Sequence, residues 1–462
     1  MEFRFSCPKC KQKFKAELEQ AGSVVDCPSC KSEFRVPNAQ PIPPVLRDST
    51  NTNSNLQGEH KCPVCWLRFD TGDIMHIATH DSLRGDELLG VDAQQRFLAT
   101  RFNNNGQALD PMGLPSSEFA CPHCRRKLPQ CFLNMPHHII SLVGDQSSGK
   151  SYFLSMLIKV LATTLYRNFG IVFQDSDPTG NAPLNDMRKA LAGAQTPAQA
   201  KLAKTVFEGA MYERLPRQGR TVALPRPFVY TLSRETDARD QCALIFYDNA
   251  GEHFQPGVNI VEQPGAQHVA SAAGIVFLFD PFNSPEFRHA LQDTKDPQIE
   301  KLVVDQQDII LAEMRARIQI IRNFQPGEHF NTPVAFVVGK SDAWIHLMNG
   351  QPLLEPVRDG KLERAVIEEN SSNVCALLNR LCPPVVANAK ALSSNVMFFA
   401  ASSFGHTPLR TGPGEFVPDP AKLRPVQIEV PLLWILTQIS SSLIPQHHAE
   451  RANTPSIRLE KK

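Results

Sequence analysis

The sequence predicts an α/β fold, a mainly parallel sheet flanked by helices, preceded by two small zinc-binding modules. Two observations lead to this prediction. Apolar runs of strand length alternate with helical patterns from residue 137 to residue 445, which is typical of βαβ units. Eight of the 12 cysteines stand in four Cys-Pro-x-Cys pairs, a spacing typical of zinc sites.

Composition narrows the class of protein. The formal net charge is +1, so the overall charge gives no support to nucleic-acid or membrane-surface binding. No signal peptide is visible, and no apolar run approaches the ~18–20 residues that span a bilayer. Paired cysteines without an export signal indicate metal ligation in a reducing compartment, so we expect a cytoplasmic protein.

Residues 1–37 are predicted to form a zinc ribbon. Each Cys-x-x-Cys turn presents two thiolates to one metal, and two such turns complete a tetrahedral site: Cys7, Cys10, Cys27 and Cys30. So small a domain buries little apolar surface, so the metal must supply folding energy. The stretch resembles short bacterial zinc ribbons that end in Phe-x-Val-Pro, here Phe34 to Pro37, and such ribbons bind proteins or nucleic acids. Residues 38–59, rich in Pro, Asn, Ser and Thr, are predicted to be a flexible linker.

Residues 60–136 are predicted to hold a second zinc site with an insertion that includes a helix near 92–102. We favour a four-cysteine ligand set: Cys62, Cys65, Cys121 and Cys124. A rival set combines the first two cysteines with His76 and His80 in the pattern C-x2-C-x10-H-x3-H. The rival leaves the second cysteine pair without a role, but the sequence keeps both sets open.

Residues 137–445 are predicted to form the α/β domain, and residues 446–462 a disordered tail. The predicted strands are 139–143, 228–232, 243–247, 274–279, 334–338 and 396–400. The predicted helices are 152–166, 184–213, 298–323, 362–381 and 431–444. The stretch 170–220 looks like an added strand and helix.

The first of these strands leads into a phosphate-binding loop. The motif G-x-x-x-x-G-K-[ST] is matched by Gly144, Asp145, Gln146, Ser147, Ser148, Gly149, Lys150 and Ser151. Backbone N–H groups of such a loop converge on an anion at a helix N-terminus. Lys150 would bring a positive charge to the β- and γ-phosphates, and Ser151 a hydroxyl to Mg²⁺.

Two later motifs favour guanine nucleotides. Asp248 ends an apolar strand, and Gly251 follows three residues later; this Asp-x-x-Gly resembles the Mg²⁺ and γ-phosphate motif of Ras-like and translation-factor GTPases. Lys340-Ser-Asp342 resembles their base-reading motif, in which the aspartate accepts two hydrogen bonds that adenine cannot donate. Gly339 departs from that family, where Asn or Thr ties the motif to the P-loop.

Two further sites follow from the same resemblance. Ser402, after the last strand, matches the loop that contacts guanine O6. A switch I threonine should lie in a loop before strand 228–232 and bind Mg²⁺, and Thr221 fits best.

Catalytic residues are harder to assign. Lys150 is the first expected catalytic residue. Glu252 and His253 follow Gly251 directly, at the position where related enzymes orient the attacking water. A carboxylate at that position predicts slow or partner-dependent hydrolysis. Arg217 and Arg220 are alternative arginine fingers in cis.

The combination resembles bacterial zinc-ribbon-containing GTPases of the TRAFAC class, of the double-GTPase type. This implies a GTPase switch that binds GTP or GDP, Mg²⁺ and two Zn²⁺, with a protein partner such as a second GTPase. An alternative is a zinc-ribbon adaptor for protein or nucleic acid whose G domain binds nucleotide but hydrolyses it weakly. An ATPase is a third hypothesis, based on the departure at Gly339.

Overall fold

The computed structural model describes residues 2–6, 9–10, 12–17, 23–35, 59–145, 148–202, 209–217, 220–234, 237–248, 267–300, 307–324, 328, 330–348, 350–412, 414–440 and 442–447. The chain divides into two compact units, Met1–Met135 and Pro136–Lys462.

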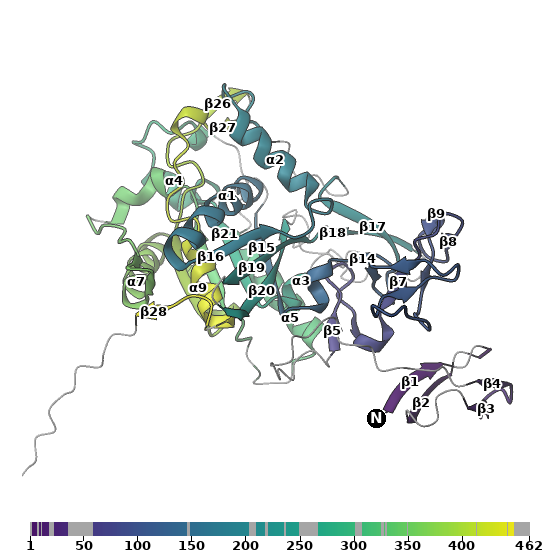
Figure 1. The fold of residues 1–462 in the computed structure, drawn as a ribbon. Helices are drawn as coiled ribbons and strands as arrows, with labels where there is room; N and C mark the ends of the chain where they lie inside the picture. The colour runs from purple at the N-terminus through teal and green to yellow at the C-terminus, as the bar shows by residue number, and fades with distance from the viewer. Residues whose placement is uncertain are drawn as a thin grey trace, which may run out of the picture. The chain divides into compact units, whose positions relative to one another are not determined.

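A seven-stranded sheet lies at the centre of the second unit, with helices around it (Figure 1). Its order is β16-β19-β20-β15-β21-β22-β25, with bounds Ile171–Asp175, Phe228–Arg234, Asp237–Asp248, His137–Gly144, Gly274–Phe279, Val334–Val338 and Val396–Ala400. The five strands from β20 to β25 are mutually parallel, while β16 and β19 add an antiparallel edge. The α/β class with a mainly parallel sheet is therefore confirmed.

The central strands are apolar throughout, with no alternation of apolar and polar residues, because both faces of the sheet are covered. Every residue of β21 and β22 is buried. One face packs on α1 (Lys150–Phe169) and α9 (Val430–Ile439) in a single core. The other carries an aromatic row in which Phe277 stacks on Phe336 and Phe279 contacts Phe287 of α4 (Pro285–Ala290).

The remaining helices are α2 (Ala182–Gly193), α3 (Gln267–Ser271), α5 (Gln307–Arg322), α6 (Ser341–Trp344), α7 (Arg364–Leu381) and α8 (Pro383–Leu392). Short strands complete the unit: β17 (Tyr212–Arg217), β18 (Arg220–Pro225), β23 (Val357–Arg358), β24 (Lys361–Glu363), β26 (Leu409–Gly412), β27 (Glu415–Val417) and β28 (Gln446–His447). All six predicted strands are present. The added strand and helix in 170–220 correspond to β16 and α2.

The predicted helix 184–213 is wrong beyond α2. Helix α2 ends at Gly193, and the chain enters a hairpin in which β17 pairs with β18. Pro197 lies inside the predicted helix, and a proline in a helix interior removes a hydrogen bond and clashes with the preceding turn, so the helix does not continue there. Residues 203–208 of the predicted helix lie outside the described residues. Residues 383–392, beginning with two prolines, form α8, which was not predicted; proline is tolerated in a first helical turn.

The first unit is made of short antiparallel pairs. Residues 2–35 hold the hairpins β1–β2 (Glu2–Ser6, Lys13–Glu17) and β3–β4 (Val24–Asp26, Glu33–Arg35). Residues 59–135 hold β5–β6 (Glu59–Lys61, Arg68–Asp70), β8–β9 (Arg84–Asp86, Gly90–Gln94), β11–β12 (Ala108–Leu109, Pro115–Ser116) and a sheet of order β10-β7-β13-β14 (Arg96–Phe97, Met75–Ile77, Phe119–Ala120, Lys127–Leu128). The helix predicted near 92–102 is wrong, because β9 and β10 form there: pairing with β8 and β7 overrides helix propensity.

A buried carboxylate organises the insertion of this module. Asp110 accepts hydrogen bonds from the backbone N–H groups of Thr79, His80, Met112 and Leu114, at 2.9–3.1 Å. Burial alone would raise its pKa, but these four donors together hold the pKa below the usual range. One side chain thus joins two loops that are 30 residues apart in the chain.

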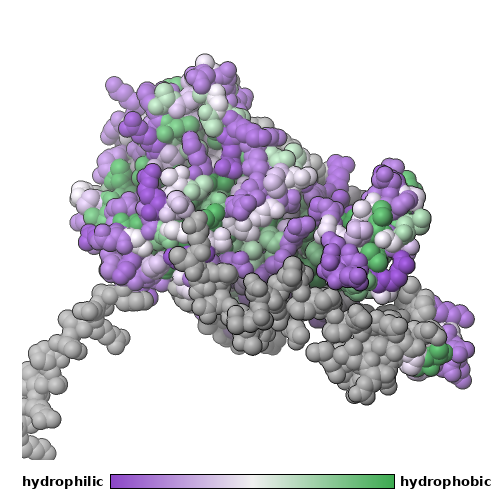
Figure 2. Space-filling view, viewed as in Figure 1, coloured by the Kyte–Doolittle hydropathy of each residue, from purple (hydrophilic) through white to green (hydrophobic). Residues whose placement is uncertain are grey.

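Hydrophilic side chains dominate the visible face of the described residues (Figure 2). Exposed large apolar residues such as Val91, Met112, Tyr166 and Ile320 are spread over both units, which is normal for a protein surface. Among the described helices, none combines the length and the apolar character that a bilayer span requires.

Candidate functional site

The predicted P-loop joins the carboxyl end of β15 to the start of α1. Two glycines are required by its shape. A Cβ at Gly144 would lie 2.5 Å from the backbone oxygen of Leu278 on the neighbouring strand, and Gly149 has a φ of +93°. The described part of the loop therefore has the close backbone approach and left-handed turn of an anion-binding loop. Gln146 and Ser147 lie outside the described residues.

The lysine of the motif folds back over the loop. The Lys150 ammonium is buried and donates to the carbonyl oxygens of Gly144 at 3.0 Å and Asp145 at 2.7 Å. The neighbouring Ser148 hydroxyl is buried and accepts or donates no hydrogen bond among the described residues. A positive charge and a hydroxyl are thus held next to the N-terminus of a 20-residue helix, where the helix dipole favours an anion.

Two of the three predicted Mg²⁺ ligands, Ser151 and Asp248, are brought into direct contact. Ser151, on the first turn of α1, donates its hydroxyl to Asp248 Oδ2 at 2.6 Å. Asp248 ends β20, and its side chain is buried. A hydroxyl and a carboxylate beside a phosphate loop are the hard oxygen donors that Mg²⁺ prefers, so these two residues fit the ion.

The predicted base-reading motif lies at the end of β22. Lys340 has a φ of +57° and donates to Asp280 Oδ2 at 2.7 Å, with its ammonium 5.3 Å from the centre of the Phe282 ring. Asp342, on α6, accepts a hydrogen bond at Oδ1 from the Ser402 hydroxyl. The same hydroxyl accepts from the N–H of Gly405 at 2.8 Å, so it is fixed in orientation. The predicted Lys340, Asp342 and Ser402 therefore form one cluster.

Strand register brings these segments to the same edge of the sheet. Leu142 is level with Asp248, Gly144 with Leu278, and Phe279 with Val338. Because the strands are parallel, every segment that follows one of them emerges at the carboxyl edge, where open α/β sheets bind ligands.

Thr221 is not where the prediction placed it. It lies inside β18, paired with Pro216, instead of in a loop, because the segment before β19 forms the β17–β18 hairpin. Its side chain is exposed. Arg217 and Arg220 pair at the end of the same hairpin. Gly251, Glu252 and His253 lie outside the described residues, so the proposed water-positioning groups keep the status of predictions.

Sequence reasoning missed three polar residues near the cluster. Asp280 and Asn283 follow β21, and Asp296 lies further along the same connection. All three are buried. Burial raises the pKa of Asp296 above its usual range, although N–H groups of Gln298 and the charge of Lys340 act in the opposite direction. The available signal was positional: Asp280 comes directly after an apolar strand, as Asp248 does.

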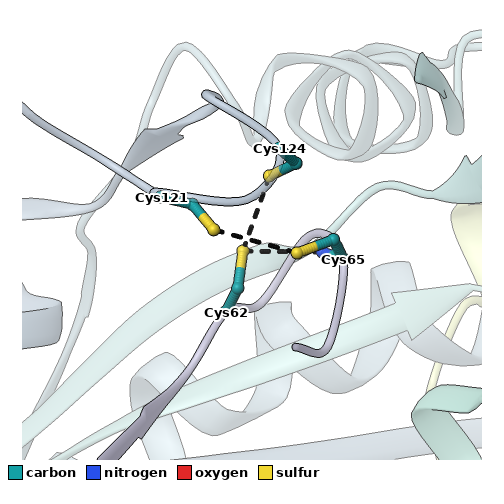
Figure 3. A group of neighbouring side chains, drawn as sticks. All are labelled: Cys62, Cys65, Cys121 and Cys124. Atoms are coloured by element: carbon teal, nitrogen blue, oxygen red, sulfur yellow. Dashed lines mark hydrogen bonds between the residues drawn. The ribbon is translucent and has the colours of Figure 1, made fainter. Parts of the chain in front are cut away.

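The second module brings the four predicted cysteines together in two facing loops (Figure 3). All four are buried, and the Cys62–Cys124 and Cys65–Cys121 sulfur pairs are each 3.8 Å apart. Tetrahedral Zn²⁺ with Zn–S bonds of about 2.3 Å requires sulfurs about 3.8 Å apart. The cluster therefore fits a closed zinc site.

The same knuckle geometry recurs in three Cys-Pro-x-Cys turns. In each, the first cysteine's carbonyl accepts from the residue after the second cysteine, at 2.7–3.0 Å. That residue has positive φ: Lys31 at 54°, Trp66 at 59° and Arg125 at 61°. Backbone N–H groups also point at sulfur, as from Val64 to Cys62 at 3.3 Å. Such donors stabilise a thiolate, the form that binds a metal.

The two histidines of the rival ligand set make other contacts. The His76 ring lies between Phe97 and Phe119, with ring centres 5.8 and 5.1 Å away, and burial lowers its pKa. His80 Nδ1 hydrogen-bonds the Ser82 hydroxyl at 2.7 Å. Neither histidine belongs to the sulfur cluster.

In the first module, Cys10, Cys27 and Cys30 form a second group of thiols, with the sulfurs of Cys10 and Cys27 3.5 Å apart. Cys7, the fourth predicted ligand, lies outside the described residues. Three sulfurs at this spacing suit zinc as well.

No protein-family model matches the chain, and no curated protein matches it. Among solved structures, it is similar to the Arl6 small GTPase of Trypanosoma brucei with a bound nucleotide analogue, at 10% identity and a TM-score of 0.25. That match covers 66% of this chain and 98% of the other.

Proposed function

We propose that this protein is a Mg²⁺-dependent guanine-nucleotide-binding protein that hydrolyses GTP and acts as a switch, with its zinc modules as adaptors. The observation that carries the proposal is the 2.6 Å contact between Ser151 and Asp248, next to the buried Lys150. Two chain segments that are separate in sequence, Lys150-Ser151 and Asp248, supply the positive charge, hydroxyl and carboxylate that a nucleoside triphosphate with Mg²⁺ requires.

In this proposal Ser151 and Asp248 hold the metal, and the loop N–H groups hold the phosphates. When bound, Mg²⁺ would neutralise charge that develops on the phosphate oxygens. Lys150 would exchange its two carbonyl partners for phosphate oxygens, which are stronger, charged acceptors.

Guanine specificity would come from Asp342. The Ser402 hydroxyl engages Oδ1 and orients the carboxylate for a base. Lys340, held by Asp280, would lay its apolar stem along the base plane. Adenine has no donors for this carboxylate, so only the Ser402 hydroxyl would remain bonded to it, a mismatch that gives strong discrimination.

We also propose that Glu252 or His253 takes part in hydrolysis and that a threonine completes the Mg²⁺ site. The protein would be cytoplasmic and would act with a partner such as a second GTPase. The proposed domain limits are 1–37, 38–59, 60–136, 137–445 and 446–462. The second candidate function is an adaptor with weak turnover, favoured by the carboxylate of Glu252 beside the expected γ-phosphate site. A mobility shift with RNA and DNA at two salt concentrations tests it, because phosphate contacts weaken as salt rises.

Calorimetric titration with non-hydrolysable GTP and ATP analogues, with and without Mg²⁺, tests the main proposal. We expect Mg²⁺-dependent binding of the GTP analogue alone, lost in Lys150→Ala and kept in Lys159→Ala, a control on an exposed position of the same helix. Comparable affinity for the ATP analogue would refute the guanine part, and no binding of either would refute the nucleotide site.

A further inference from the structure

Building on the proposed function, we infer that Asn283 is a positioning residue for the nucleotide, because it ties the P-loop to the segment that holds the base-reading lysine. Its side-chain amide donates to Asp145 Oδ2 at 2.7 Å. Both side chains are buried, with 2% and 7% of their surface exposed. The two residues are 138 positions apart in the chain.

The turn that carries Asn283 is rigidly held. Residues Pro281–Asn283 form a single helical turn after β21, and Asp280 caps it by accepting from the N–H of Phe282 at 3.0 Å. Gln307 brackets the backbone of Asp280, accepting from its N–H at 2.7 Å and donating to its carbonyl at 3.1 Å. A contact made from this turn therefore fixes its partner in place.

The two ends of the turn hold the two halves of the site. Asp280 accepts from Lys340 of the base-reading motif, and Asn283 donates to Asp145 of the phosphate loop. Gly339 has no side chain with which to reach the P-loop, and its N–H donates to the carbonyl oxygen of Phe279 at 2.9 Å. The four residues from 280 to 283 thus supply the link between the phosphate end and the base end.

The chemistry of the pair explains how it would set affinity. Asp145 brings a carboxylate into a loop that must bind an anion, where a negative charge facing the phosphates would weaken binding. The amide of Asn283 holds one oxygen of that carboxylate against the turn after β21. The loop N–H groups then remain directed at the ligand.

Substitution of the pair and exchange of its members test the inference. Asn283→Asp would place two carboxylates at a 2.7 Å contact and displace the loop, so we expect the dissociation constant of the Mg²⁺-bound GTP analogue to rise about 10- to 100-fold. Asn283→Ala should weaken binding in the same direction. The double variant Asn283→Asp with Asp145→Asn restores an amide–carboxylate pair and should recover most of the loss.

Asn181→Asp is the matched control. Asn181 is also buried and also donates its amide to an aspartate, Asp175 Oδ1, at 2.6 Å, but at the β16 edge of the sheet. Thermal unfolding without nucleotide is measured for every variant. We expect the control to lose stability while keeping affinity.

Two outcomes overturn the inference: Asn283→Ala and Asn283→Asp binding as the wild type does, or an affinity loss that the exchange leaves uncorrected in a protein of normal thermal stability. Absence of nucleotide binding by the wild type would instead refute the proposed function itself.

Discussion

A methyl group added at Gly144 tests the geometry of the P-loop most directly. In Gly144→Ala the new Cβ would lie 2.5 Å from the Leu278 carbonyl oxygen and 3.0 Å from the Ser148 hydroxyl. The serine can rotate, but the carbonyl belongs to the backbone of β21. Gly144 and Leu278 are register partners at the end of a parallel pair, so relief requires the two strands to separate there.

The expected effect has two parts. Forcing a methyl group into a packed site costs about 1–3 kcal/mol of folding free energy. Because the strands separate where the loop begins, its N–H groups should also lose their convergence, and we expect at least about tenfold weaker binding of the Mg²⁺-bound GTP analogue.

Urea-induced unfolding and calorimetric titration measure the two parts separately. Gly193→Ala is the control, because a Cβ at this position of α2 meets nothing within 4 Å. It should leave affinity unchanged and stability equal or up to about 1 kcal/mol higher. Gly149→Ala should weaken binding through its φ of +93° alone, without a contact. If Gly144→Ala unfolded and bound as the wild type does, the close approach of β15 and β21 would not shape the loop.

Two further predictions concern the second module. Cys65→Ser should release zinc and remove the protection of backbone N–H groups in residues 59–135 from hydrogen exchange. Cys131→Ser, outside the sulfur cluster, should do neither. Metal analysis measures the first effect and hydrogen exchange the second. Asp110→Asn should destabilise the module by about 1–3 kcal/mol, because one amide oxygen cannot serve four N–H donors. The pKa of Asp110 is lowered by folding, so its contribution is present above the unfolded pKa near 3.8 and is lost as the pH falls through the folded value; unchanged acid unfolding in the variant would contradict this.

Local features of the sequence predicted much of the fold. Each of the six predicted strands is an apolar run between polar segments, and burial on both faces leaves no other place for it. The Cys-Pro-x-Cys turns are local as well, because their geometry comes from hydrogen bonds within six residues. Helix 184–213 was wrong after Gly193 because Pro197 interrupts it, and because β17, which begins at Tyr212, pairs with β18, a long-range contact that helical periodicity does not reveal.

The candidate site divides in the same way. By itself the sequence determined the residue types and the order of the phosphate loop, Asp248, Lys340 and Asp342, because each motif spans a few adjacent residues. Only the tertiary structure decided which side chains meet. It brings Cys62 and Cys124 together, and not the rival histidines, and it pairs Asn283 with Asp145. Such contacts depend on strand order and register, which are set by packing of the whole core and not by any single segment.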